Sequence, residues 1–263
     1  MVDVLEGFQK EPFGFKAIQH DIYRLGAGPA VIVVSEVPGM TPRVVAFARR
    51  VAERHFTVVL PHLFGTPGRE PSGSYIARTM IQLCLSREFS GLAMGRSAPV
   101  IDWLRALARS ELERCGGPGV GVVGMCYTGG FGLAMAVDDT ILAPVLSQPS
   151  LPFPVSSARK SDIQLSESDW AKIEARQALC VLGLRFTGDR AVPPERFEML
   201  KRRLGDRFIA VELDSSADNP FGHPKMAHSV LTEHLQDREG APTQAALQQV
   251  LDFLTERLSP GGV

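Results

Sequence analysis

Short runs of apolar, often β-branched residues alternate along this chain with longer segments of helical periodicity. Residues 31–34 (Val-Ile-Val-Val) form a continuous apolar run, which is typical of a strand buried on both faces of a sheet. Thr41 and Pro42 then offer an N-cap and a first helical position, and apolar residues at helical spacing follow to about residue 55. The alternation predicts an α/β fold with a mostly parallel central sheet and helices on both faces. By the same criteria we expect strands at residues 57–60, 120–123, 141–146, 179–186 and 208–213, and helices at about 97–114, 129–137, 193–204 and 242–258.

The size and charge of the chain limit its partners. A chain of 263 residues is long for one domain, but α/β sheets of this size commonly form a single core, so we expect one domain over residues 1–263. The 28 basic and 29 acidic residues nearly cancel, which argues against electrostatic binding to nucleic acid or to an anionic membrane. The expected partner is a small molecule, and the expected assembly is a monomer or a small homo-oligomer.

The N-terminus and the cysteines indicate the compartment. No basic region followed by an apolar stretch opens the sequence, and no uninterrupted apolar segment reaches the roughly 18 residues of a membrane span. We therefore expect a cytoplasmic protein. The cysteines have no paired spacing, which fits neither a disulfide scaffold nor a zinc site, and no metal or organic cofactor is implied. We expect four free thiols, at Cys84, Cys115, Cys126 and Cys180.

Cys126 lies in a glycine-rich turn between a predicted strand and a predicted helix. Gly124 precedes it by two positions, and Gly129 and Gly130 follow at three and four. A nucleophile elbow needs small residues at such positions because its backbone segments crowd together. The start of the helix would then favour a thiolate, and the backbone N–H of Tyr127 falls where an oxyanion would be held. This pattern predicts that Cys126 is a nucleophile.

Two other interpretations of this region have to be weighed. Residues 119–124 (Gly-Val-Gly-Val-Val-Gly) match the glycine pattern of dinucleotide-binding sites. That pattern must follow a strand, whereas here residues 114–118 (Arg-Cys-Gly-Gly-Pro) precede it, so the context rejects a nucleotide site. The other alternative is that Cys126 is an inert thiol buried in a glycine-rich turn.

A cysteine nucleophile needs a base and a group that orients the base, and α/β-hydrolases carry them in the order nucleophile, acid, histidine. Asp189 follows an apolar strand in the turn at residues 187–189, and His223 follows the next strand through an irregular loop. We therefore expect Asp189 and His223 in these roles. As alternatives for the acid, Asp206, Asp214 and Asp218 stay open. Four other histidines are expected at the surface: His228 and His234 on a helix, and His55 and His62 before the nucleophile.

Two further segments bear on the site. Glu36 directly follows the apolar run at residues 31–34 and precedes Pro38 and Gly39; the ordinary interpretation is a solvated loop glutamate. In residues 147–177 the periodicity weakens and prolines stand at 149, 152 and 154. This stretch is interpreted as a lid-like insertion over the site.

Residues 124–130 (Gly-Met-Cys-Tyr-Thr-Gly-Gly) resemble the elbow of the dienelactone hydrolase family. In that α/β-hydrolase family a Gly-x-Cys-x-Gly-Gly elbow replaces the serine version of most lipases and esterases; the elbow here is one residue longer between the cysteine and the glycine pair. The resemblance runs from about residue 30 to 254 and implies an α/β-hydrolase fold. It includes Glu36, which matches the glutamate that contacts the resting thiol in the family and moves away when substrate binds. It also implies that the N–H of Val37 joins that of Tyr127 in the oxyanion hole.

The chain also departs from the family pattern. Family members that open dienelactone hold the substrate carboxylate with arginines, and one of these lies four residues after the histidine, where counting from His223 gives Ala227. Arg78 lies near the expected place of another, and Lys225 is a candidate substitute. Residues 147–177 are also longer than the family pattern. Dienelactone itself is therefore not the predicted substrate.

The sequence favours hydrolysis of an ester or lactone through an acyl-cysteine intermediate. Cys126 would attack, His223 would carry the proton, Asp189 would orient the histidine and Glu36 would tune the thiol. A thioester or an activated ester such as an organophosphate stays open as the substrate. The rival hypothesis is a non-catalytic α/β-hydrolase fold that binds a small ligand, with Cys126 as an inert or redox-sensing thiol.

Overall fold

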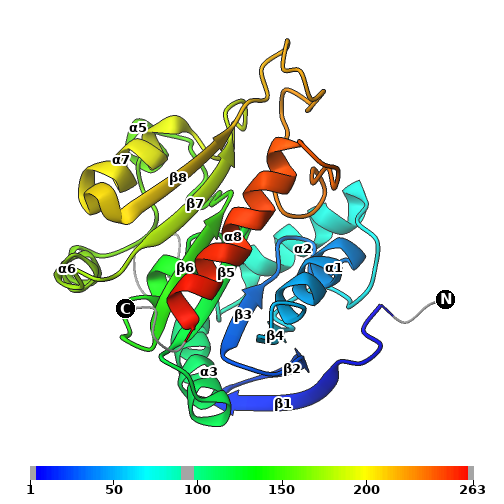
Figure 1. Cartoon of the computed structure of the whole chain (residues 1–263), viewed down its shortest axis with the longest axis vertical. Helices are drawn as coiled ribbons and strands as arrows, with labels where there is room; N and C mark the ends of the chain where they lie inside the picture. Colours follow the sequence, from blue (N-terminus) through cyan, green and yellow to red (C-terminus); the bar gives the residue numbers. More distant parts are fainter. Residues whose placement is uncertain (1–3, 90–97, 260–263) are drawn as a thin grey trace.

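A computed structural model describes residues 4–89 and 98–259 of the chain. In this part of the chain eight strands form one sheet in the order β1-β2-β4-β3-β5-β6-β7-β8 (Figure 1). From β4 to β8 all neighbouring strands are parallel, whereas β1 and β2 add an antiparallel hairpin at one edge. The strands are β1 Gln9–Phe15, β2 Ile18–Leu25, β3 Ala30–Val34, β4 Thr57–Pro61, β5 Val120–Met125, β6 Ile141–Ser147, β7 Val181–Phe186 and β8 Phe208–Leu213.

The central strands follow the prediction, and the edge hairpin was not predicted. All five residues of β3 and of β4 are buried, as expected of strands covered on both faces. In β1, by contrast, most side chains are exposed, and the strand contains Pro12 and Gly14. Such an edge strand carries no apolar run, so composition alone does not reveal it.

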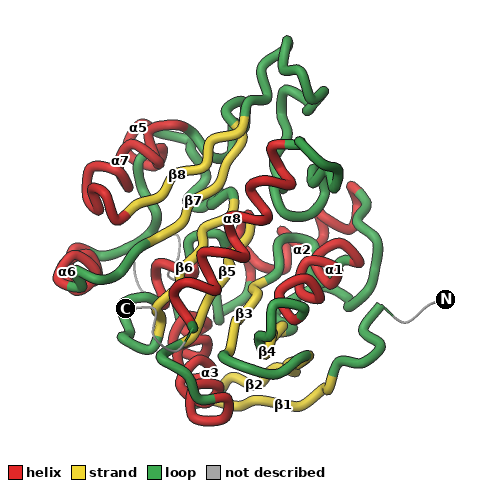
Figure 2. The backbone as a smooth tube through the Cα atoms, viewed as in Figure 1, coloured by secondary structure: helices red, strands yellow, loops and turns green. Residues whose placement is uncertain are grey.

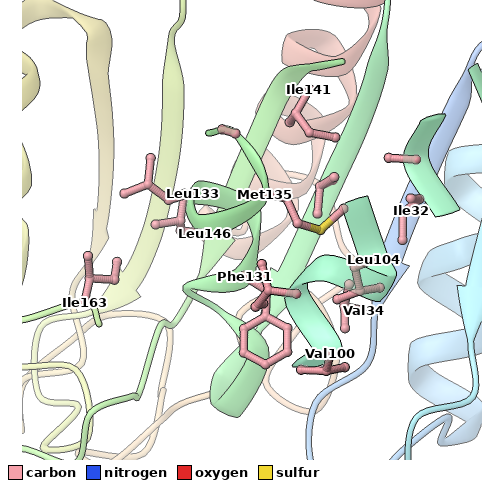
Figure 3. Packing of buried hydrophobic residues seen from close by; sticks show 14 of the residues in the cluster. Ile32, Val34, Val100, Leu104, Phe131, Leu133, Met135, Ile141, Leu146 and Ile163 are labelled. Carbon is pink, nitrogen blue, oxygen red and sulfur yellow. The ribbon is translucent and has the colours of Figure 1, made fainter. Parts of the chain in front are cut away.

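Helices cover both faces of the sheet (Figure 2). Alternate residues of β3 face opposite layers: Ile32 and Val34 pack in one apolar cluster, Val31 and Val33 in the other. Helices α1 Pro42–Ala52 and α8 Pro242–Leu258 contribute to the layer of Val31 and Val33. The opposite layer contains residues of α2 Gly73–Leu85, α3 Pro99–Cys115, α4 Phe131–Met135, α6 Glu167–Ala175 and α7 Pro194–Leu204. Figure 3 shows part of it, with residues of α3 and α4 packed against the central strands.

Some helix boundaries differ from the prediction. Helix α1 starts as expected, since the Thr41 hydroxyl accepts a hydrogen bond from the N–H of Val44 at 3.3 Å. Helix α2 was not predicted; Ser72 caps it. The helix expected at 129–137 is the shorter α4, preceded by a 3₁₀ turn at Cys126–Thr128. The helix expected from residue 97 begins at Pro99, and residue 97 itself lies outside the described residues.

The insertion at residues 147–177 is fastened to the body of the protein. It contains the short helix α5 Ser157–Lys160 and α6. Arg196 of α7 is fully buried and donates hydrogen bonds to the carbonyl oxygens of Pro149 (2.5 Å) and Pro152 (2.6 Å). Arg176 reaches the carbonyl oxygens of Ala136 (2.6 Å) and Ile141 (2.8 Å). Both ends of the insertion are therefore tied to neighbouring elements.

The parallel register brings several loop starts to one edge of the sheet. Val34 of β3 pairs with Gly124 of β5, and Met125 pairs with Ser147 of β6. On the far side Ser147 pairs with Leu184 of β7. The residues that follow these strands therefore meet at their carboxyl ends, where ligands bind in open α/β sheets. No helix among residues 4–89 and 98–259 has the length and apolar character needed to span a membrane.

Candidate active site

Cys126 occupies a sharp turn directly after β5. Its φ is 55°, in the left-handed region that side chains other than glycine rarely adopt. A Cβ added to Gly124 would lie 2.2 Å from the carbonyl oxygen of Thr128, and one on Gly129 would lie 2.4 Å from the Cα of Pro149. The glycines are therefore required by close backbone approach, and the thiol stands on a strained strand-to-helix turn.

Thr128, the additional residue between the cysteine and the glycine pair, holds this turn in place. Its side chain is fully buried. The hydroxyl lies 3.0 Å from the carbonyl oxygens of Val34 and Met125 and accepts a hydrogen bond from the N–H of Met125 at 3.1 Å. It thus links the turn to the end of β3. No pattern in the sequence indicates this role for Thr128.

The histidine beside Asp189 is His228, and the assignment of His223 to this position is wrong. His228 Nδ1 lies 2.6 Å from Asp189 Oδ2. Burial alone would lower the pKa of His228, but the charge of Cys126 and hydrogen bonds to Asp189 and Cys126 outweigh it, so that the pKa is raised well above the usual value. The structure therefore assembles Cys126, His228 and Asp189 in one cluster, which we call the Cys-His-Asp cluster.

His223 lies elsewhere in the same loop. Its ring is 5.0 Å from that of Phe186, centroid to centroid, and the residue is only 4% exposed. Asn219 fixes its backbone: the N–H of His223 donates to Asn219 Oδ1, and Asn219 Nδ2 donates to the carbonyl oxygen of His223, both at 2.8 Å. Burial, with the charge of Arg238, lowers the pKa of His223. These contacts indicate that His223 packs the loop against β7 and stabilises its backbone.

The error comes from the expected helix. His228 and His234 lie in a run of turns between β8 and α8, so neither sits on a helix surface. His234 Nδ1 accepts hydrogen bonds from the backbone N–H groups of His228 (3.3 Å) and Ser229 (3.2 Å). Burial lowers the pKa of His234, and so do the neighbouring histidines. A neutral His234 is therefore an acceptor that fixes the backbone at His228.

Asp189 is buried, and its two carboxylate oxygens have different partners. Oδ2 meets His228, while Oδ1 accepts a hydrogen bond from the N–H of Ala191 at 2.9 Å. The second bond fixes the carboxylate plane. Of the alternatives for the acid, Asp206 lies in the 3₁₀ turn Gly205–Arg207, and Asp214 accepts from the N–H of Ser216.

Glu36 is buried, so the interpretation as a solvated loop glutamate is wrong. It is 3% exposed. Its carboxylate accepts hydrogen bonds from Ser229 Oγ at 2.6 Å, from Gln148 Nε2 at 3.2 Å and from the hydroxyl of Thr232. The resemblance implies a contact with the thiol, whereas these partners come from two loops that flank the Cys-His-Asp cluster. Glu36 thus joins three segments: its own loop after β3, the loop after β6 that begins at Gln148, and residues 214–241 between β8 and α8, which we call the histidine loop.

The two residues expected in the oxyanion hole follow β3 and β5. Val37 is partly buried, next to Glu36. The ring of Tyr127 packs edge-on against Phe89, with centroids 6.0 Å apart. Burial, together with the charge of Cys84, raises the pKa of Tyr127 to about 12. The Tyr127 side chain is therefore neutral near pH 7, and its ring anchors the backbone that follows the thiol.

Ser150 is a close neighbour of the thiol that no sequence pattern indicates. Its hydroxyl oxygen lies 3.6 Å from Cys126 Sγ. Its backbone N–H donates to the carbonyl oxygen of Cys126 at 3.0 Å. The side chain is 3% exposed. The start of the insertion thus contacts the thiol directly.

The residues considered for substrate binding differ in their exposure. Arg78 on α2 and Lys225 in the histidine loop are both exposed, and Ala227 is fully buried. With His228 as the histidine, the position four residues later is Thr232, which bonds Glu36. Neither position is basic. No group of three or more metal-ligating side chains occurs among the residues that the structure describes.

Comparisons with known proteins agree with this architecture. The model of the dienelactone hydrolase family matches residues 24–258. A dienelactone hydrolase from Anabaena variabilis is similar in structure, with a TM-score of 0.62 and 15% identity over 97% of this chain and 100% of that chain. A dienelactone hydrolase-like promiscuous phosphotriesterase from metagenomic libraries has a TM-score of 0.60 and 16% identity, over 96% of this chain and 98% of that chain. A cold-adapted esterase from an Arctic intertidal metagenomic library has a TM-score of 0.57 and 14% identity, over 96% of this chain and 95% of that chain. A comparison with curated protein sequences found no match.

Proposed function

This chain belongs to the dienelactone hydrolase family and is an ester hydrolase of the α/β-hydrolase fold, and we propose that it cleaves a small carboxylic ester or lactone through an acyl-cysteine intermediate. The observation that carries the proposal is the Cys-His-Asp cluster. In it a histidine is hydrogen-bonded to a buried carboxylate, and a strained cysteine and that carboxylate together raise the pKa of the histidine. Such an arrangement activates a nucleophile and holds its base in place.

Each residue of the cluster has one role in the proposed reaction. The Cys126 thiolate attacks the ester carbonyl carbon, and His228, protonated by the thiol, gives its proton to the leaving alcohol. Water then attacks the acyl-cysteine, with His228 as the base, and the thiol is restored. Asp189 orients His228 and stabilises its charged form.

The oxyanion would be held by backbone N–H groups of Val37 and Tyr127. Both residues follow the carboxyl ends of neighbouring parallel strands, and Thr128 ties the two strand ends together. A fixed pair of donors needs no reorganisation as charge develops on the carbonyl oxygen. In this proposal Glu36 supports the loop of Val37 through its bonds to Gln148, Ser229 and Thr232.

The proposed substrate is neutral near the reacting bond. The resemblance places a carboxylate-binding arginine four residues after the histidine, and this chain has Thr232 there. The nearby Glu36 is a buried carboxylate held by neutral donors, which disfavours an anionic group close to it. Arg78 and Lys225 stay candidates for substrate contacts at the exposed rim.

A phosphotriester is the second candidate substrate. One structural neighbour is described as a dienelactone hydrolase-like promiscuous phosphotriesterase. A thiolate can attack phosphorus as well as carbon, and the same donors would hold the phosphoryl oxygen. The two substrates separate by comparing kcat/KM on aryl esters and aryl phosphotriesters of the same leaving group.

The decisive experiment measures hydrolysis of an aryl-ester panel by the wild type, Cys126→Ala and Cys126→Ser. Cys126→Ala is expected to abolish turnover, and mass spectrometry of the wild type during turnover should detect the acyl adduct on Cys126. Unchanged hydrolysis in both variants would sink the proposal and favour a binding or redox role of the thiol. Selective alkylation of Cys126 by iodoacetamide over Cys84, Cys115 and Cys180 gives a second, substrate-free check.

A further inference from the structure

We propose that Ser150 is an additional catalytic residue, whose hydroxyl donates a hydrogen bond to the Cys126 thiolate. The inference rests on the proposed function, since it needs Cys126 as the nucleophile. It assigns a chemical role to the start of the insertion. The insertion would then supply part of the reaction centre itself.

The geometry places the hydroxyl beside the reacting atom. Ser150 Oγ lies 3.6 Å from Cys126 Sγ, within the range of hydrogen bonds to sulfur. The backbone N–H of Ser150 also bonds the carbonyl oxygen of Cys126 at 3.0 Å. Two contacts between the same two residues fix both the backbone and the side chain of Ser150 relative to the thiol. Because Ser150 is 3% exposed, bulk water does not compete freely for its hydroxyl.

The turn that carries Ser150 is held from behind by a buried arginine. Arg196 is fully buried, and its guanidinium donates to the carbonyl oxygens of Pro149 and Pro152, which bracket Ser150. A third bond, to the carbonyl oxygen of Arg159, lies at 3.0 Å. Burial lowers the pKa of Arg196 to about 10, so it stays charged near pH 7. Arg196 is thus a positioning residue for Ser150.

On the side opposite Arg196, the turn that carries Ser150 contacts the elbow at Gly129. A Cβ on Gly129 would lie 2.4 Å from the Cα of Pro149, so the backbone before Ser150 is in contact with the backbone after Cys126. A donor fixed in this way stabilises charge on sulfur without reorganisation.

The proton balance is simple. The thiol proton goes from Cys126 to His228, and Ser150 keeps its own proton and points it at the sulfur. When the thiolate forms its bond to the acyl carbon the hydrogen bond weakens, and it returns when deacylation restores the thiolate. Hydrogen bonds to charged acceptors are stronger than those between neutral groups, so the hydroxyl favours the thiolate over the thiol.

The test compares Ser150→Ala with Ser157→Ala, a matched variant at an exposed serine of α5 in the same insertion. Iodoacetamide alkylation of Cys126 is followed over a range of pH without substrate, and kcat/KM is measured on an aryl ester. In Ser150→Ala the alkylation rate and kcat/KM are both expected to fall about tenfold near neutral pH, because a pKa change of about one unit at Cys126 changes the thiolate population by that factor. The difference should shrink at high pH, where the thiol is ionised in both proteins. Ser157→Ala should match the wild type, and Ser150→Thr, which keeps a hydroxyl, should recover part of the rate.

Two results would overturn the inference. One is unchanged alkylation and unchanged kcat/KM in Ser150→Ala; the other is a loss of equal size at every pH, which would mean that Ser150 acts only by packing. If Ser150→Ala does not fold, Ser150→Gly removes the hydroxyl without adding bulk, and the same two readouts apply. Failure of the proposed function looks different, because then Cys126→Ala itself keeps hydrolysis.

Discussion

The elbow at Cys126 and the loop that carries His228 both end in the Cys-His-Asp cluster, yet they are built in different ways. The elbow takes its shape mainly from residues close in sequence: Gly124 allows the backbone to approach Thr128, and the Thr128 hydroxyl accepts a hydrogen bond from the N–H of Met125. The loop between β8 and α8 has no regular secondary structure, and it is tied to the site by the bonds of His228 to Asp189 and of Ser229 to Glu36, 39 and 193 residues apart in the chain. Local backbone rules therefore describe one half of the site and long-range polar contacts describe the other.

The first test of this comparison replaces the histidine. His228→Ala is expected to lower kcat/KM on an aryl ester by about 10²–10⁴-fold, the usual contribution of a general acid–base group. His223→Ala, a histidine of the same loop, should change it by only a few fold because His223 packs against Phe186. Steady-state kinetics on the two variants measures the difference. The reverse ranking would restore His223 as the base and contradict the geometry.

The second test concerns the charge of the histidine. The pKa of His228 is raised, so the folded protein keeps this proton above the roughly 6.5 of a free histidine. Activity that needs a protonated His228 should therefore extend to higher pH and fall as pH rises through the raised pKa. The free energy of unfolding depends on pH in the same direction. The stabilisation by the His228 contacts is complete below the pKa of histidine in the unfolded chain and is lost as pH rises through the raised pKa of the folded protein.

Asp189→Asn sharpens the second test. It removes the charge that supports the protonated ring, so kcat should fall on the order of 10²-fold and the alkaline limb of the pH–rate profile should move to lower pH. Asp206→Asn, in the turn before β8, is the control. An alkaline limb that stays in place in Asp189→Asn would show that another group determines it.

The third test addresses the elbow. In Gly124→Ala the new Cβ meets the carbonyl oxygen of Thr128 at 2.2 Å, and the expected loss in the free energy of unfolding is about 2–4 kcal/mol. Gly73→Ala is the control, because a Cβ there meets no heavy atom within 4 Å. Urea unfolding measures both. Equal stability of the two variants would mean that the elbow relaxes without cost.

The fourth and smallest effect is expected in the histidine loop. Asn219→Ala removes both bonds to the backbone of His223, at a cost of about 1–2 kcal/mol in the free energy of unfolding. Asp218→Ala, an exposed neighbour, should be neutral. If Asn219→Ala were as costly as Gly124→Ala, the two halves of the site would be equally rigid, and the comparison would fail.

The same contrast explains what the sequence could predict. The central strands and most sheet-covering helices follow from apolar periodicity, and the glycine spacing around Cys126 predicts its turn because both signals are local. His228 could not be recognised in this way, since turns and apolar residues at 226–235 imitate a helical pattern and only the bond to Asp189 distinguishes it from His223. Ser150 and Arg196 belong to contacts 24 and 47 residues apart in the chain, for which a single sequence carries no signal.

The left-handed backbone at Cys126 limits which amino acids evolution or design can place there. Serine differs from cysteine by one atom and adopts this conformation at a similar cost, so exchange between a thiol and an alcohol nucleophile is sterically open. Threonine, with its branched Cβ, is a strong outlier at a φ of 55°. The turn therefore acts as a filter on nucleophile chemistry: it admits two of the three common side-chain nucleophiles before any substrate is bound.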